Sequence, residues 1–67
     1  MKILLNNNQE EVAGDHISVS ELLKYKNFTF KMLVIKINGA LVKKPDYDFV
    51  LIREGDEVNV LHLISGG

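Results

Sequence analysis

The segment Ile17–Leu22 limits the fold more than any other, because it carries two signals for the start of a helix. Ser18 is followed three residues later by Glu21, the spacing of a capping box, and Ile17 and Leu22 occupy the two positions of a hydrophobic staple. The residues that follow give an apolar face of Val19, Leu22 and Leu23, with Lys24 and Lys26 expected to reach water. A helix with one apolar face must cover another element, and we expect that element to be a sheet.

Short apolar and β-branched segments on both sides of this helix predict strands. The strands are expected at Met1–Asn6, Gln9–Ala13, Leu33–Ile37, Ala40–Val42 and Glu57–Leu63. Asn6-Asn7-Asn8 predicts a turn, and Asn38-Gly39 predicts a type I′ hairpin, whose two central residues need positive φ. Pro45 favours a short helical or 3₁₀ turn, the apolar stretch Phe49–Ile52 follows it, and Glu54-Gly55-Asp56 predicts a turn before the last strand.

Strands before and after one helix that covers a single sheet face are typical of an α+β domain of the β-grasp (ubiquitin-like) type. We expect a mixed sheet of four to five strands packed on one helix. The first and last strands should lie side by side and parallel at the sheet centre, which accounts for the apolar character of Met1–Leu5 and Val58–Leu63. Residues 1–67 are interpreted as one such domain, with a flexible segment at residues 65–67.

Length and composition exclude several classes of protein. A chain of 67 residues is too small for both a core and a deep substrate cleft. The absence of cysteine removes disulfides, thiolate metal sites and a cysteine nucleophile. A net charge of −1 with scattered basic residues gives no stripe for nucleic acid, and the short apolar start predicts neither a signal peptide nor a membrane span. We therefore expect a cytoplasmic protein, monomeric when free, that binds neither nucleic acid nor membrane.

The sequence ends in Ser65-Gly66-Gly67, directly after the apolar stretch Val58–Ile64. Glycine has no Cβ and accepts both signs of φ, so two consecutive glycines form a thin, pliable strip that can enter a narrow enzyme channel. The reactive group is then expected to be the main-chain carboxylate of Gly67. The alternative is a frayed end without a role, because termini often finish in small residues.

Alternation along the first and last strands separates a core face from an outer face. Val60 falls on the face that meets the helix, whereas Leu61 and Leu63 fall on the opposite face. By the same alternation, Leu4 lies outside the core. Together with Ile64, these three leucines are expected to form a partner-docking patch. The alternative is a set of ordinary scattered surface residues.

The remaining polar residues favour structural roles over chemical ones. His16 and His62 have no cysteine companions, so no metal site is expected, and His62 is interpreted as a surface residue of the last strand. Glu54, Asp56 and Glu57 form a small acidic cluster that serves either a solvated turn or the steering of a basic partner. No catalytic group is predicted within the chain.

Three parts of the sequence together resemble the ThiS family, the ubiquitin-like sulfur carriers of thiamine thiazole synthesis. They are the hairpin Val34–Gly39, the segment Glu54–Val58 and the terminal Leu63–Gly67. The likeness covers the whole chain and is most specific at the C-terminal end, where a Gly-Asp-x-Val turn leads through an apolar strand to a small residue and two glycines.

The resemblance implies a carrier that is acted on by enzymes, is not itself an enzyme, and binds no cofactor. A ThiF-like adenylating enzyme would use ATP to adenylate the carboxylate of Gly67, with Ser65 and Gly66 threaded into the partner. A persulfide donor protein would then displace AMP to leave a covalent thiocarboxylate, and a ThiG-like thiazole synthase would receive the sulfur. An α-carboxyl group is ionised at neutral pH, as the first step requires.

Two alternatives to this function stay open. One is a sulfur carrier for molybdopterin or tRNA thiolation (MoaD-like), and the other is a β-grasp binding module without covalent chemistry. MoaD-like chains are usually longer and often have prolines before the terminal segment, where this chain has His62-Leu63. Length and terminal sequence therefore favour the thiamine pathway.

Overall fold

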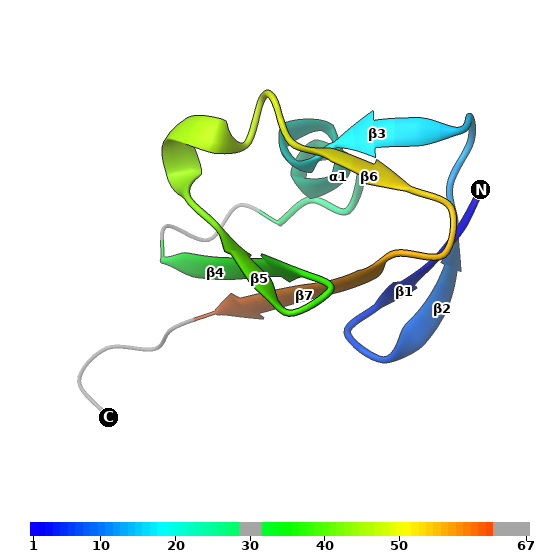
Figure 1. Ribbon diagram of the computed structural model, residues 1–67, viewed down its shortest axis with the longest axis horizontal. Coiled ribbons are helices and arrows are strands. Elements are labelled where there is room, and N and C mark those ends of the chain that lie inside the picture. Colours follow the sequence, from blue (N-terminus) through cyan, green and yellow to red (C-terminus); the bar gives the residue numbers. More distant parts are fainter. Residues whose placement is uncertain (29–31, 63–67) are drawn as a thin grey trace.

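The computed structural model describes residues 1–28 and 32–62. Within them the chain forms two layers, a main sheet and, on one of its faces, a helix with a two-stranded ribbon (Figure 1). The main sheet has the strand order β2-β1-β7-β4-β5, and its strands are β1 (Lys2–Leu5), β2 (Asn8–Glu11), β4 (Leu33–Ile37), β5 (Ala40–Val42) and β7 (Glu57–His62). The other elements are β3 (His16–Ser18), α1 (Val19–Tyr25), a 3₁₀ helix (Lys44–Asp46) and β6 (Leu51–Arg53).

The central strands are arranged as the sequence predicts. β1 and β7 run parallel, with Leu5 beside Val58. On its other side β7 pairs antiparallel with β4, from Leu33 beside His62 to Ile37 beside Val58. A mixed five-stranded sheet packed on one helix confirms the predicted α+β fold class.

The start of α1 also confirms its sequence signals. Ser18 is the N-cap, and its Oγ accepts a hydrogen bond from the Glu21 main-chain N–H at 3.1 Å. The Glu21 carboxylate accepts one in return from the Ser18 main-chain N–H at 3.2 Å. The hydrogen bond from the Ser18 main chain, followed by that with its side chain, holds the pKa of Glu21 below its ordinary value. Both reciprocal bonds of the capping box are therefore present.

The core lies between α1 and the main sheet, and its buried members among residues 1–28 and 32–62 are all aliphatic. Its buried members are Ile3, Leu5, Val12, Val19, Leu22, Ile35, Val42, Ile52, Val58 and Val60. They come from both layers and from both ends of the sequence. The apolar side chains of the helix and of the central strands therefore bury one another. Since the hydrophobic gain scales with the apolar area removed from water, this one cluster is the main source of stability.

Two hairpins of the main sheet close through two-residue turns. Asn6 and Asn7 have φ values of 50° and 66°, and they place Leu5 opposite Asn8. Asn38 and Gly39 have φ values of 51° and 85° in the second hairpin. Positive φ at both central residues is the type I′ geometry, whose twist matches that of the flanking strands.

The structure differs from the sequence expectations in three places. The second strand is Asn8–Glu11 instead of Gln9–Ala13. β3 and β6 form an antiparallel ribbon, with Ile17 opposite Ile52, that the sequence did not predict. Strands of three residues are too short to show a clear alternation of apolar and polar side chains. Their pairing also joins residues far apart in the chain, so no local pattern predicts it.

Lys26 is the third difference. It was expected to reach water, as Lys24 does. Instead its Nζ donates to the Glu10 carboxylate at 3.1 Å, and 31% of its side chain is exposed. Lys26 is the C-cap residue of α1, and Glu10 lies opposite Ile3 on the helix-facing side of β2, so the pair closes one edge of the core.

Candidate docking surface

The face of the main sheet that points away from α1 is the candidate functional surface. Along β7 the residues alternate as predicted, because Val58 and Val60 are 1% and 7% exposed whereas Leu61 is 49% exposed. Along β1, Ile3 is buried and Leu4 is half-buried. Successive side chains of a strand point to opposite faces, so Leu4 and Leu61 share the outer face.

An apolar patch occupies this outer face near the C-terminal end of β7. Val34 lies directly opposite Leu61 on the neighbouring strand β4. Leu41 lies opposite Lys36 and therefore diagonal to Val34, and it is 59% exposed. Directly opposed and diagonal residues on one sheet face are close enough for long side chains to touch. We call Val34, Leu41 and Leu61 the outer patch.

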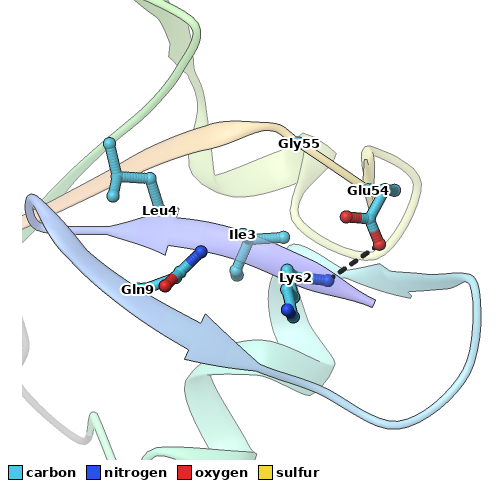
Figure 2. Close-up of a pocket in the computed structure, with 6 residues that line it drawn as sticks. All are labelled: Lys2, Ile3, Leu4, Gln9, Glu54 and Gly55. Carbon is cyan, nitrogen blue, oxygen red and sulfur yellow. Dashed lines mark hydrogen bonds between the residues drawn. The ribbon is translucent and has the colours of Figure 1, made fainter.

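Leu4 belongs to a different part of the same face. It lies beside Glu57, four residues before Leu61 along β7, which corresponds to about 13 Å at the rise of a β-strand. With Lys2, Ile3, Gln9, Glu54 and Gly55 it lines a shallow hollow of about 260 Å³ (Figure 2). The outer face is thus apolar toward the end of β7 and mixed toward its start.

The other predicted site residues lie outside the described part of the chain. They are the docking residues Leu63 and Ile64, the threading residues Ser65 and Gly66, and the modified residue Gly67. The described residue that comes next to this C-terminal segment is His62, which is exposed at the end of β7, as the sequence predicts. Leu61 of the outer patch is the neighbour of His62 and thus the outer-patch residue nearest in sequence to this segment.

The acidic cluster is built into the turn before β7. The Glu54 carboxylate accepts a hydrogen bond from the Lys2 main-chain N–H at 2.8 Å (Figure 2). The Asp56 carboxylate accepts one from the Arg53 main-chain N–H at 2.9 Å and another from the Asn38 side-chain amide at 3.1 Å. The bonds from Lys2 and Arg53 satisfy main-chain donors at a tight turn and support the structural interpretation of the cluster.

His16 Nδ1 lies 2.7 Å from the Asp15 carboxylate at an exposed site. Residues 1–28 and 32–62 contain no group of three or more histidine, cysteine or acidic side chains that could hold a metal ion. No helix in this described part is long and apolar enough to cross a membrane.

Val34 and Leu41 were not singled out from the sequence. Val34 lies between Leu33 and Ile35 in an uninterrupted apolar run, so hydropathy alone does not tell which of them faces outward. The register settles this question, because the buried Ile35 pairs with the buried Val60 and Val34 pairs with the exposed Leu61. The signal that identifies Val34 is thus the β4–β7 register, which neither segment specifies alone.

Solved structures share this fold over the whole chain. A crystal structure of the thiamine biosynthesis protein ThiS from Geobacter metallireducens superposes with a TM-score of 0.90 at 23% identity, covering 100% of both chains. A solution NMR structure of a thiamine biosynthesis protein from the same organism gives a TM-score of 0.79 at 25% identity, covering 100% of this chain and 88% of the other. The predicted β-grasp fold is confirmed, and it places the chain among the ubiquitin-like domains.

Sequence comparison identifies the family. The uncharacterised protein ycf40 of Trieres chinensis is 26% identical over 66 residues, which cover 98% of this chain and 90% of that relative. The ThiS family itself matches residues 3–67. The chain therefore belongs to the ThiS family of ubiquitin-like sulfur carriers, as its resemblance implied.

Proposed function

We propose that this protein carries sulfur for thiamine biosynthesis on the carboxylate of Gly67. The observation that supports this most directly is the family match, which extends over residues 3–67 and so includes the terminal Ser65-Gly66-Gly67. The solved structures with the same fold are thiamine biosynthesis proteins. The chain supplies the group that is modified, and partner enzymes supply the catalysis.

The proposed cycle begins with attack of a Gly67 carboxylate oxygen on the α-phosphorus of ATP, bound to a ThiF-like enzyme, with release of pyrophosphate. A persulfide sulfur then attacks the carbonyl carbon of the acyl adenylate and expels AMP. A thiol cleaves the resulting S–S bond by forming a disulfide with the donor sulfur, which leaves the thiocarboxylate. A ThiG-like thiazole synthase receives this sulfur.

The outer patch gives the activating enzyme a surface beside the strand that ends in the reactive segment. Leu41 and Leu61 are exposed and Val34 is half-buried. The proposal gives Leu63 and Ile64 a docking role as well, with Leu4 at the periphery of the docking surface. Burying an apolar side chain of this size at an interface contributes about 1.5 to 3 kcal/mol. Docking through the sheet leaves the glycines to enter the active site, where correct placement of the carboxylate governs the rate.

Mass spectrometry of the intact protein tests the proposal. Incubation with ATP, an activating enzyme of the ThiF type and a persulfide donor should exchange one carboxylate oxygen for sulfur, a gain of about 16 Da. Fragmentation should locate this gain at the C-terminal residues, because oxidation of Met1 or Met32 would add a similar mass. Deleting Gly67, or adding residues after it, should abolish the gain and leave the circular dichroism spectrum unchanged. An unmodified wild-type chain beside a demonstrably active partner would contradict the proposed function, as would modification of the truncated chain.

A further inference from the structure

Asn6 connects the two central strands at the point where their regular pairing ends. The parallel register of β1 and β7 runs through Leu5 beside Val58. β7 continues to His62 and is paired with β4 along this whole length. The final residues of β7 therefore have a full strand partner on one flank, whereas on the other flank β1 turns away into its hairpin.

The side chain of Asn6 takes over the next bond of the interrupted ladder. Its main-chain N–H donates to the Val58 carbonyl at 2.9 Å, as a strand residue would. In a regular parallel ladder, the carbonyl of the same residue accepts the next N–H along the partner strand. Here the Val60 N–H donates instead to Oδ1 of the Asn6 side chain, at 2.8 Å.

The backbone of Asn6 explains this replacement. Its φ of 50° belongs to the first central position of the type I′ turn and rotates its main-chain carbonyl out of the strand direction. That carbonyl accepts from the Asn8 side-chain amide at 3.2 Å. Asparagine tolerates positive φ and also carries an amide carbonyl on a short side chain, so it can turn the chain and still present an acceptor to Val60.

We propose that Asn6 is a positioning residue for modification of the carrier, because its side chain fixes the end of β7 from which the C-terminal segment departs. This inference rests on the proposed function. The bond is half-buried and anchors Val60, the residue that precedes Leu61 of the outer patch. Asn6 thereby acts through β7, the strand that carries Leu61 and leads in sequence to Gly67.

The consequence for kinetics is a separation of two parameters. The outer patch governs binding to the activating enzyme and therefore KM. The proposed role of Asn6 concerns how often the bound carboxylate is in line with the α-phosphorus, and therefore kcat. Losing the Asn6 bond should lower kcat for adenylation by at least about fivefold, since small misplacements of a reacting group carry rate losses of up to about a hundredfold. The KM for the carrier should stay within about twofold of wild type, because none of the outer-patch side chains is altered.

The chain supplies matched variants for the test. Asn6→Gly keeps the positive φ and removes the side-chain acceptor. Asn7→Gly makes the same change at the adjacent turn residue, whose φ is 66° and whose side chain is exposed. Asn6→Asp keeps an acceptor oxygen at the same position. Val42→Ala removes buried apolar volume from edge strand β5, which β4 separates from β7, and serves as the control for a general loss of stability.

The readouts are steady-state adenylation kinetics with a ThiF-type enzyme and amide hydrogen exchange at Val60, measured where all variants are folded. Asn6→Gly should expose the Val60 amide to exchange and lower kcat, whereas Asn6→Asp and Asn7→Gly should retain both. A kcat that is unchanged while the Val60 amide exchanges freely would overturn the proposal, and so would an equal loss of kcat in Val42→Ala. If Asn6→Gly does not fold, synthesis of the chain with an ester between Asn59 and Val60 removes the donor instead, and the same loss of kcat is expected.

Failure of this inference is distinguishable from failure of the proposed function. A wild-type chain that gains no adenylate or sulfur contradicts the function itself, and the positioning role with it. A wild-type chain that is modified normally, beside an Asn6→Gly variant that is modified equally fast, retains the function and overturns the positioning role alone.

Discussion

The two faces of the central strands have opposite roles although they are built from neighbouring residues of the same segments. On β7, Val58 and Val60 are buried under α1, and Asn59 and Leu61 point away from it. The inner face gains stability from a closed aliphatic core, whereas the outer face keeps apolar side chains accessible near the end of the strand. A one-residue shift of register would exchange these roles, so the pairing of β7 with β1 and β4 determines both fold and docking surface.

Reversing the chemistry of the inner face should have the largest effect. Val60→Asp removes a buried apolar side chain, a loss of about 1.5 to 3 kcal/mol, and places a carboxylate where it has no partner, which adds several more. The total approaches the whole stability expected of a domain this small, about 3 to 10 kcal/mol. We expect an unfolded or barely folded protein by circular dichroism and urea titration. A folded Val60→Asp protein would show that the two faces are assigned the wrong way round.

The same substitution one residue later should act on binding instead. Leu61→Asp should leave the protein folded and weaken binding to the activating enzyme by at least about 1 to 2 kcal/mol, because a carboxylate replaces an apolar contact and is desolvated. Isothermal titration calorimetry with the ThiF-type partner measures this. Gln9→Asp, on the same face but on edge strand β2, is the matched control and should bind normally. Equal weakening by both variants would mean that overall charge, not the outer patch, determines affinity.

Leu4→Asp sharpens the boundary of the docking surface. Leu4 shares the outer face with Leu61 but lies beside Glu57 at the other end of β7. We expect a smaller loss of affinity than for Leu61→Asp, about 1 kcal/mol or less, as is usual for residues near the rim of an interface. The same calorimetric titration decides. A loss as large as that of Leu61→Asp would extend the docking surface over the mixed hollow near Lys2 and Glu54.

Sequence alone was sufficient for those features that depend on local patterns. The capping box at Ser18, the Asn38-Gly39 turn and the alternation from Val58 to Leu61 each follow from residues a few positions apart, and all three are present. Features that depend on pairing between distant segments were missed. The β3–β6 ribbon, the position of Val34 opposite Leu61 and the bond from Val60 to Asn6 all require a register that no single segment specifies.

Lys26 shows a third limit, since its place on the polar side of the predicted helix suggested full solvation. Lys26 is the C-cap residue of α1, and its ammonium group donates to Glu10, a carboxylate that alternation along β2 places on the inner face. The inner face is thus apolar at its centre and closed at one edge by a half-buried ion pair. A helical pattern predicts which residues of the helix face a sheet. It does not predict which residue of a sheet edge will contact the end of the helix.

The smallest expected effect is on the stability of α1, the helix that covers the inner face of the sheet. The Glu21 carboxylate accepts a hydrogen bond from the Ser18 main-chain N–H, which favours its charged form and holds its pKa below the ordinary value of 4.5. A carboxyl group whose pKa is lowered by folding contributes stability above its unfolded pKa and loses that contribution as the pH falls through its folded pKa. The capping contribution should therefore be complete at neutral pH and fade only below about 4.5.

An NMR titration of the Glu21 side chain measures this directly. Ser18→Ala removes the hydroxyl that accepts from the Glu21 N–H and loosens the reciprocal bond, so it should move the pKa of Glu21 back toward its ordinary value. The same variant should lose helix stability at neutral pH, as N-cap substitutions do, by about 1 kcal/mol. A Glu21 pKa that is the same in both proteins would mean that the capping box does not hold this carboxylate in solution. The attachment of α1 to the inner face of the sheet would then depend on the packing of Val19 and Leu22 alone.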